Sequence, residues 1–364
     1  MSGVDLGALA TRLAPIVVFL LTITVTAEIA QHAGVFDVLG HRVARWGRHR
    51  VWLLWLLFAG LAVTCTTFLS IDTTAVLLTP VGLAIAAQIG ATPYPFALTT
   101  LWIANTGSLF LPVSNLTNLL ALHRADELGV GHAGFVRLAL APGAVSVVVT
   151  LAVIGVLHRR DLRRSYAVDP PPEPHDPVLL RVAMVVTLAV GPLFAVGLSP
   201  AWVASAAAAL LVATLAWRDR RTLRRVSVPW LMAVGFVVVA GLVAWADARG
   251  LGGWLRSLIG EGRSTRSLLA VAAGGAVGAN AVNNLPAYLA LEPVAATAPT
   301  RLIALLIGVN TGPLVTPWAS LATLLWLQRC RSAGVPVRLG RLALAGLLCA
   351  ALVVPLATLT LAAG

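Results

Sequence analysis

The sequence has no lysine, few acidic residues and only three cysteines. All 26 basic residues are arginine, and Asp and Glu together number 14. Charged residues make up 11% of the 364 and hydrophobic residues 59%, a balance that excludes an ordinary soluble domain. A net charge of +12 would favour nucleic acid as the partner of a soluble protein. Here the arginines gather in short segments between apolar runs, so we expect no nucleic-acid partner.

The scarcity of reactive side chains also argues against catalysis. Cys65, Cys330 and Cys349 have no CxxC spacing and no histidine partner, so they are interpreted as small apolar fillers. The chain has no HExxH motif and no cluster of histidines and carboxylates spaced for a metal or a nucleophile. We therefore expect no catalytic residue, no metal site and no cofactor. The chain is not predicted to be an enzyme.

Charge is absent from long stretches of the chain. Residues 73–122 and 182–217 contain no Asp, Glu, Lys or Arg. A bilayer is crossed by about 20 apolar residues in a helix. The fold class predicted is therefore an all-α polytopic membrane protein, placed in the inner (plasma) membrane. Arginine-rich segments are assigned to the cytoplasm by the positive-inside rule; they are residues 42–50, 159–164, 218–225 and 329–341.

One apolar span carries polar residues at its middle. Residues 105–124 read NTGSLFLPVSNLTNLLALHR, and hydrocarbon cannot satisfy the polar groups of such a stretch. A second copy, NTGPLVTPWASLATLLWLQR, occupies residues 310–329 and matches the first at 10 of 20 positions without a gap. A broken apolar helix that occurs twice is typical of secondary transporters. We predict broken helices over 95–123 and 300–328.

Two further apolar segments, 51–89 and 268–297, are interrupted by polar residues and are short for two crossings. Each is predicted to be a re-entrant hairpin, the first with its tip near Ser70–Thr74. Asp72 lies at that tip, and a lone carboxylate there favours a role with an ion, water or solute. Glu28, near the end of a first span at 12–33, is instead interpreted as a carboxylate close to the lipid headgroups.

The two halves follow the same order of span, hairpin, broken helix and span. The first repeat covers residues 1–157, a cytoplasmic Arg- and Pro-rich linker covers 158–177, and the second repeat covers 178–364. A hairpin does not change sides, so five crossings separate equivalent spans, and an odd number predicts inverted-topology repeats. Both termini are then expected outside, and the hairpin tips and helix breaks meet near the midplane.

The broken elements expose backbone groups at membrane depth, where they can replace the water around a small solute. Asn, Ser and Thr add neutral donors and acceptors. The site predicted therefore suits a small, polar, neutral or weakly charged solute. Its substrate- or ion-binding residues are expected to be Asp72, Thr73, Ser114, Asn115, Thr117, Asn118, Asn283, Asn284, Asn310, Thr311, Ser320 and Thr323.

These segments resemble the arsenite/antimonite permease family of the ion transporter superfamily. The run from Leu111 to Asn118 is similar to the family's first broken-helix motif, and Asn283-Asn284-Leu285-Pro286 to its second hairpin. Gly312 to Pro317, followed by Ser320 to Trp326, is similar to the second broken helix. Asp72, followed by the run Ala75 to Pro80, is similar to the first hairpin.

The resemblance implies arsenical resistance through export of arsenite and antimonite, as neutral trihydroxides, in exchange for protons. The mechanism we expect is alternating access, with Asp72 as the proton-coupling residue. It also implies a homodimer in the membrane lipid and, for some members, a cytoplasmic ATPase subunit. Two helices that precede the first repeat in the family are absent here, from a shortened variant or a misassigned start. The alternative function is a sodium- or proton-coupled carrier of another small solute of the superfamily, such as a dicarboxylate or a cation.

Overall fold

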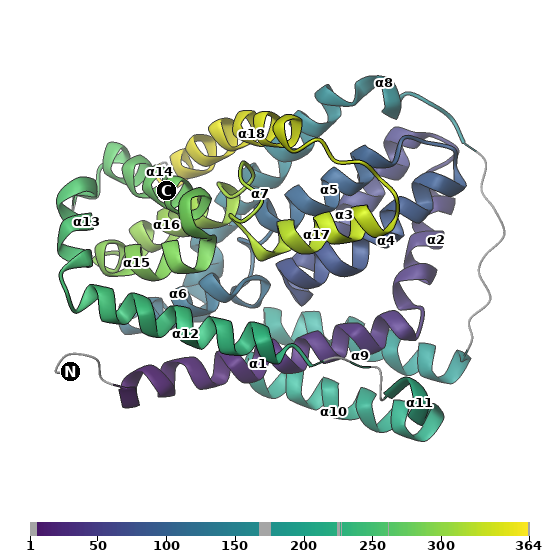
Figure 1. Cartoon of the computed structure of the whole chain (residues 1–364), viewed down its shortest axis with the longest axis horizontal. Coiled ribbons are helices and arrows are strands. Elements are labelled where there is room, and N and C mark those ends of the chain that lie inside the picture. The colour runs from purple at the N-terminus through teal and green to yellow at the C-terminus, as the bar shows by residue number, and fades with distance from the viewer. Residues whose placement is uncertain (1–5, 167–175, 224–225, 227, 261, 363–364) are drawn as a thin grey trace.

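The computed structural model describes residues 6–166, 176–223, 226, 228–260 and 262–362, and this part of the chain is helical with no strand. Figure 1 shows the helices in chain order. The first half contains α1 (Leu6–His32), α2 (Val35–Trp46), α3 (Val51–Leu69), α4 (Ile71–Gln88), α5 (Pro93–Thr106), the 3-10 turn η1 (Pro112–Ser114), α6 (Leu116–Glu127), α7 (Gly131–Leu157) and α8 (Arg159–Leu162). The second half contains α9 (Pro177–Ala195), α10 (Pro200–Arg218), α11 (Arg220–Leu223), α12 (Trp230–Asp247), α13 (Leu251–Ile259), α14 (Thr265–Val282), α15 (Asn284–Ala295), α16 (Pro299–Thr311), α17 (Leu321–Ser332) and α18 (Leu339–Leu359).

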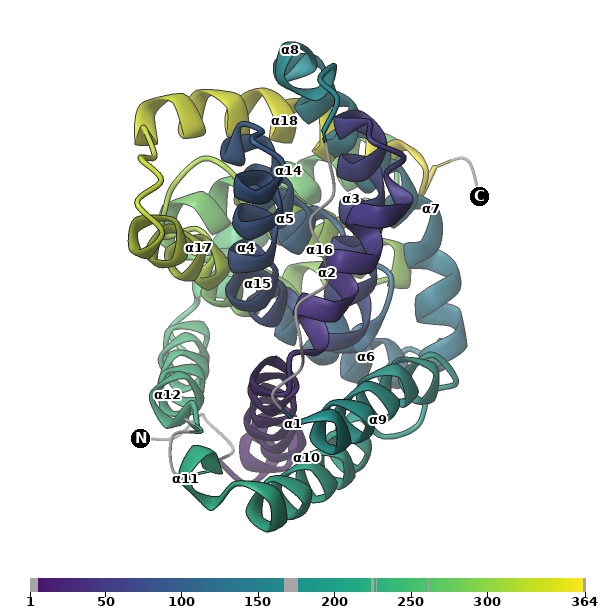
Figure 2. The same cartoon turned by 90° about the vertical axis from the view of Figure 1, so that its right-hand side faces the viewer.

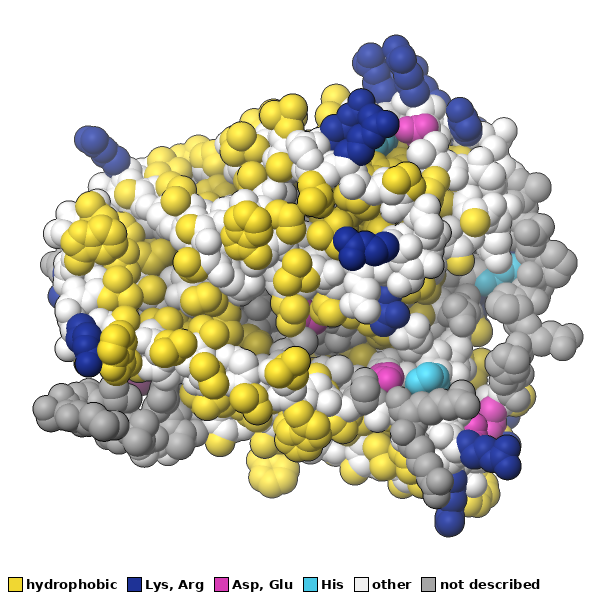
Figure 3. All heavy atoms as spheres, in the orientation of Figure 1, with side chains coloured by type: hydrophobic (Ala, Val, Ile, Leu, Met, Phe, Trp, Pro, Cys, Tyr) yellow, Lys and Arg dark blue, Asp and Glu magenta, His cyan; other side chains and the backbone are white. Residues whose placement is uncertain are grey.

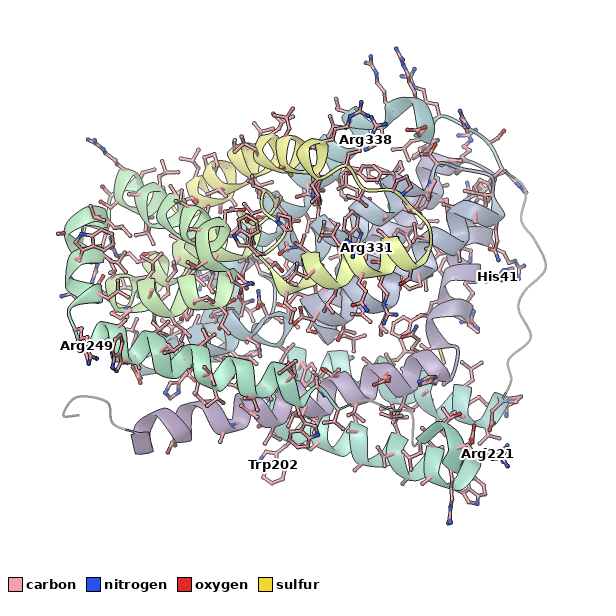
Figure 4. The ribbon with its side chains drawn as sticks, in the orientation of Figure 1. His41, Trp202, Arg221, Arg249, Arg331 and Arg338 are labelled. Carbon is pink, nitrogen blue, oxygen red and sulfur yellow. The ribbon has the colours of Figure 1, made fainter. Side chains whose placement is uncertain are left out.

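Seven of the described helices are long and apolar enough to cross a membrane, and the bent pair α12 and α13 would make an eighth span. The seven are helices α1, α3, α4, α7, α9, α10 and α18. Exposed tryptophans lie on this apolar surface; Trp202 of α10 points away from the body of the protein in Figure 4. The prediction of a multi-pass helical membrane protein is confirmed.

Both predicted breaks are present. The first separates α5 from α6 between Gly107 and Asn115, and the second separates α16 from α17 between Gly312 and Ser320. The first broken helix extends a few residues beyond the predicted 95–123 at each end, because Pro93 starts α5 and the last turn of α6 reaches Glu127.

Each predicted hairpin is a pair of helices that meets at one residue with a positive φ. Ser70 (φ 125°) lies between α3 and α4, and Asn283 (φ 137°) lies between α14 and α15. Both side chains cap the helix that follows, by accepting a hydrogen bond from the N–H of Thr73 and of Leu285. With 19 and 18 residues, α3 and α4 also reach the length of a full span, so the re-entrant course of this pair stays a prediction.

Some elements differ from the expectation. The arginine-rich segment 42–50 overlaps the amphipathic helix α2 (Val35–Trp46), which the apolar pattern does not predict. Helix α13, between α12 and α14, is likewise not predicted by the sequence pattern. The linker begins with the short helix α8, while residues 167–175 of its proline-rich part lie outside the described residues.

The arginine-rich segments gather at one end of the molecule. In Figure 1, α2, α8 and α11 lie at the right-hand end, whereas the start of α1 and the end of α18 lie at the left. Figure 4 places Arg221, Arg331 and Arg338 toward the right-hand end and Arg249 at the opposite one. This distribution matches the one expected if the right-hand end faces the cytoplasm.

The helices form two layers, which Figures 1 and 2 both show. Helices α1, α9 and α10 pack on one another in one layer, with α12 beside them. The hairpins and the broken helices form the other layer. Within it the two halves are interlocked, because α4 packs on α17 of the other half and α15 contacts α6 in the equivalent way.

Close packing in the second half depends on glycine. A Cβ added at Gly308 of α16 would lie 2.1 Å from the carbonyl oxygen of Ala272 of α14. A Cβ at Gly346 of α18 would lie 1.9 Å from the carbonyl oxygen of Leu314 in the second break. Small residues let helix backbones approach closely where no hydrophobic force drives helices together within lipid. These contacts fix α14 and α18 against the second broken helix.

Candidate functional site

Four helix N-termini converge on one cavity of about 320 Å³. Its wall contains the first residues of α4 (Ile71 and Asp72), α6 (Leu116, with the cap Asn115) and α17 (Leu321, with the cap Ser320). The fourth N-terminus is that of α15, which contributes residues 283–286. The cavity thus brings both hairpin tips and both helix breaks together, as the sequence predicted.

Helix α12 closes the cavity from the other layer. Gly235, Phe236 and Val239 contribute its apolar wall, and none of them was singled out from the sequence. The only sequence signal for them was that α12 is apolar along its length, which does not distinguish a cavity wall from a lipid-facing surface.

The helix N-termini and Asp72 give the cavity opposite electrostatic features. Each N-terminus presents unsatisfied N–H groups and about half a positive charge, which favour oxygen atoms of a solute. Of the described residues in the wall, Asp72 alone carries a formal charge. Its carboxylate has no hydrogen bond or ion pair with any described residue. Asp72 is therefore available to a proton, a cation or the solute.

A closed network of hydrogen bonds lies behind the cavity at the first break. The Oδ1 atom of Asn310 accepts from Asn115 Nδ2 at 3.0 Å and from Thr117 Oγ1 at 2.8 Å. Asn310 Nδ2 donates to Asn118 Oδ1 at 2.7 Å. All four side chains are buried, and Asn310 belongs to α16. This network therefore joins the first break to the second half of the chain.

The carbonyl groups freed by the first break are satisfied within the break itself. Asn118 Nδ2 donates to the carbonyls of Ser108, at 2.6 Å, and Leu111, at 3.1 Å. The hydroxyl of Ser114 donates to the same two carbonyls. These contacts hold the loop between α5 and α6 in one shape and leave little of its polarity free for a solute.

The second break is held by a residue of the neighbouring hairpin, Asn280. Its Nδ2 donates to the carbonyl of Gly312 at 2.8 Å, and its Oδ1 accepts from the backbone N–H groups of Val315 and Thr316. Asn280 was not among the predicted site residues. It lies three residues before the hairpin tip, in the run 278–286. The sequence showed a polar residue there but could not predict which groups it would bond.

At and just after the second break, two polar side chains lack a hydrogen-bond partner among the described residues. Within the described part of the chain, the buried hydroxyls of Ser320 and Thr323 have no hydrogen-bond partner. Ser320 also lines the cavity. A buried hydroxyl without a partner is costly, so a ligand or water is the expected partner of Ser320.

The predicted residues divide into three groups. Five line the cavity: Asp72, Asn115, Asn283, Asn284 and Ser320. Four others support it from behind or beside it: Ser114, Thr117, Asn118 and Asn310.

The last three are not brought to the cavity. Thr311 donates to the carbonyl of Ile307 in its own helix, and Thr323 does not line the cavity. Thr73 lines a second, larger cavity of about 740 Å³, whose wall also contains Asp72, Glu28, His32 and Arg329.

Comparison with known proteins places this arrangement in a family. A sequence model of the citrate transporter family, CitMHS, matches residues 2–323. This chain belongs to that family. Because its relatives are transporters and its helices suit a bilayer, the family member described here is a multi-pass membrane transporter.

Curated relatives of this CitMHS member carry another name. The arsenical pump membrane protein of Yersinia enterocolitica is 29% identical over 340 residues, which cover 85% of this chain and 76% of the relative. The arsenical pump membrane protein of Escherichia coli (strain K12) is 28% identical over 349 residues, with the same two coverages. The resemblance to arsenical pumps is confirmed.

A solved structure shares the fold. The YdaH transporter of Alcanivorax borkumensis superimposes with a TM-score of 0.68 at 16% sequence identity, over 98% of this chain and 86% of that chain. At this identity the likeness shows the fold of the CitMHS member.

Proposed function

We propose that this transporter exports arsenite and antimonite in exchange for protons by alternating access. The observation that carries the proposal is a cavity formed at four helix N-termini, in which Asp72 is the one formal charge among the described residues of the wall. The similarity to arsenical pump membrane proteins supports the choice of solute.

The lining of the cavity suits a neutral trihydroxide. Its oxygen atoms can accept from helix N–H groups, and its hydroxyls can donate to Ser320, Asn115 or an ionised Asp72. No Arg or Lys stands among the described residues of the wall to bind a multivalent anion. The buried thiols Cys65, Cys330 and Cys349 lie outside the wall, so a solute that reacts with thiols meets none there.

Exchange with protons follows if the solute and the proton compete for Asp72. An ionised Asp72 accepts a charge-assisted hydrogen bond from the solute, whereas a protonated Asp72 is a weaker, neutral acceptor and has one oxygen occupied by the proton. The solute then binds from the cytoplasm when Asp72 is ionised and leaves when a proton arrives from outside. Each half-cycle thus carries one of the two through the same site.

Inverted repeats supply the two conformations that this cycle requires. In Figure 1, α5 leads to α6 toward the left-hand end, whereas α16 leads to α17 toward the right-hand end. The opposed course of the broken helices supports assignment of residues 1–157 and 178–364 to inverted repeats. The homodimer and a cytoplasmic ATPase subunit belong to the proposal as partners suggested by the family.

The second candidate is a sodium- or proton-coupled carrier of a carboxylate. The family name and the four helix N-termini favour it, since N-termini bind anions readily. Asp72 opposes it, because an ionised carboxylate repels another unless a cation or proton lies between them.

Transport into everted membrane vesicles tests the two candidates. With an acid interior, we expect vesicles that contain this protein to accumulate arsenite, and the Asp72→Asn variant to accumulate none above empty vesicles. Excess citrate should leave the uptake unchanged. Absence of gradient-driven arsenite uptake by the unaltered protein would overturn the proposal, and sodium-dependent citrate uptake would establish the second candidate.

A further inference from the structure

Asp72 lies in the walls of two cavities, and the larger one contains titratable groups that the transport site does not use. This cavity, of about 740 Å³, lies between α1, α4 and α17. Its wall includes Glu28 and His32 of α1, Asp72 of α4 and Arg329 of α17. Figure 3 shows the corresponding hollow between α17 and α1, with acidic and histidine side chains at its rim.

Glu28 and His32 form a pair one helical turn apart. The Nε2 atom of His32 lies 4.0 Å from Oε1 of Glu28, and the two side chains are 37% and 24% exposed. Each reaches the surface and also lines the cavity that leads to Asp72. The sequence favoured a headgroup-level role for Glu28, whereas the structure turns it toward the same cavity as Asp72.

We propose that this cavity is the proton route between Asp72 and the cytoplasm, with Glu28 and His32 as its relay. A proton leaves the Asp72 carboxyl for water in the cavity and passes to the Glu28 carboxylate or the His32 imidazole. It is then released to bulk water, so only O–H and N–H bonds form and break. The volume holds a chain of waters, at roughly 30 Å³ for each. The inference rests on the proposed proton coupling at Asp72.

The surroundings of the relay are consistent with protons as the ion that passes. The charged and titratable side chains facing Asp72 here are Glu28 and His32 from α1 and Arg329 from α17. Of the other described elements packed on α4, α2 contributes Phe36 to the wall, and α3 and α5 contribute no residue to it. The fixed positive charge of Arg329 opposes entry of a free cation such as sodium. The Glu28 carboxylate can instead take up a proton and carry it as a neutral acid.

The position of the cavity fits release to the cytoplasm. Glu28 and His32 lie in the last turns of α1, directly before α2, and Arg329 opens the arginine-rich segment 329–341. Both regions belong to the end of the molecule at which the arginines gather (Figure 4). The solute site and the proton route therefore share Asp72, and their other described lining residues differ.

Chemical rescue by imidazole tests the relay. The assay uses vesicles whose acid interior drives arsenite uptake. There we expect His32→Ala to slow uptake about tenfold and millimolar imidazole to restore most of the lost rate. Glu28→Gln should slow uptake without rescue by imidazole, and arsenite affinity should stay within about twofold in both variants. A tenfold change in rate corresponds to about 1.4 kcal/mol of barrier.

A matched pair elsewhere provides the control. His123 and Glu127 of α6 are also four residues apart, at 3.5 Å, and lie outside this cavity. His123→Ala should change neither the uptake rate nor its response to imidazole. If the unaltered protein shows no proton-driven uptake, the proposed function fails. If that uptake is present and requires Asp72, but His32→Ala and Glu28→Gln transport like the unaltered protein, the relay alone is wrong. The relay is also overturned if the variants slow uptake, weaken arsenite binding and are not rescued by imidazole.

Discussion

The two helix breaks have the same origin in sequence but satisfy their polar groups in different ways. At the first break, Ser114 and Asn118 bond the carbonyls of Ser108 and Leu111, so the loop closes on itself. At the second break, the loop is held from outside by Asn280, and the hydroxyl of Ser320 stays without a partner in the described part of the chain. The first break is therefore a rigid support, whereas the second leaves the Ser320 hydroxyl available to a ligand.

This difference has a mechanical consequence. A loop that satisfies its own groups keeps its shape when its neighbours move, whereas a loop held by a neighbouring hairpin moves with that hairpin. The second break and hairpin α14–α15 thus behave as one unit, which is also fixed by the close approach of α16 to α14 at Gly308. In an alternating-access cycle, we expect movement at the second break to follow the hairpin.

Asn310 and Asn105 occupy equivalent positions in the two copies and provide the largest expected contrast. Asn310→Ala leaves buried groups of Asn115, Thr117 and Asn118 without a partner, at about 1–3 kcal/mol for each. We expect lost transport and a clearly lower unfolding temperature of the purified protein. Asn105 only donates to Leu101 of its own helix, and its Oδ1 has no partner among the described residues. Asn105→Ala should therefore cost about 1 kcal/mol at most, and an equal effect of the two variants would remove the asymmetry.

Asn280 and Thr67 form the second contrast, three residues before the tip of each hairpin. Asn280→Ala removes the bonds to Gly312, Val315 and Thr316, and should release the second break, with transport reduced at least about tenfold. The buried hydroxyl of Thr67 has no partner among the described residues, so Thr67→Val should be nearly neutral. Transport rates and protease sensitivity of the loop 312–320 measure both. Unchanged protease sensitivity in Asn280→Ala would show that another contact holds the break.

Ser114 and Ser320 separate support from binding. Ser114→Ala removes one of two side chains that donate to the same carbonyls; because Asn118 still donates to both, stability should fall by about 1 kcal/mol. Ser320→Ala should leave the unfolding temperature unchanged, because its hydroxyl has no partner among the described residues, and weaken arsenite binding about five- to tenfold. Thermal unfolding and equilibrium binding of the two variants check the contrast. The reverse pattern would assign the ligand to the first break.

Thr323 provides the smallest expected effect. It is buried and without a partner in the described residues, yet it lies outside the cavity wall. Thr323→Val removes an unsatisfied hydroxyl and should leave arsenite affinity within about twofold while keeping or slightly raising stability. Strongly weakened binding in this variant would place Thr323 on the solute after all.

The sequence was sufficient for the broken elements because hydrocarbon tolerates polar backbone so poorly. The runs around Pro112 and Asn283 predicted interruptions at membrane depth, and the chain is interrupted there. The convergence of Asp72, Asn115, Asn284 and Ser320 also followed from the repeat. Which polar side chains face the cavity did not follow. Ser114 and Asn118 lie within three residues of Asn115 in the sequence, yet their side chains bond the loop instead of lining the cavity. Where they point depends on which carbonyls the break leaves without a helical partner.

Contacts between distant segments could not be predicted from the sequence, because they depend on how the helices pack together. Asn280 was one of several polar residues in its run, and only packing decides that it reaches Thr316. Helix α12 carries no polar signal, so the roles of Phe236 and Val239 in the wall depend on the docking of two layers. Glu28 reads as a residue near the headgroups until α1 is placed beside α4.

If solute and proton compete for Asp72 in one cavity, binding of the solute must release a proton, and this release can be measured. Arsenite is added to the purified protein in weakly buffered detergent solution, and the change in pH is recorded together with the bound arsenite. With the unaltered protein, we expect up to one proton to leave for each arsenite bound at mildly acidic pH, and no release from Asp72→Asn, which should still bind. Binding without proton release in the unaltered protein across the pH range, or equal release from both proteins, would contradict the account.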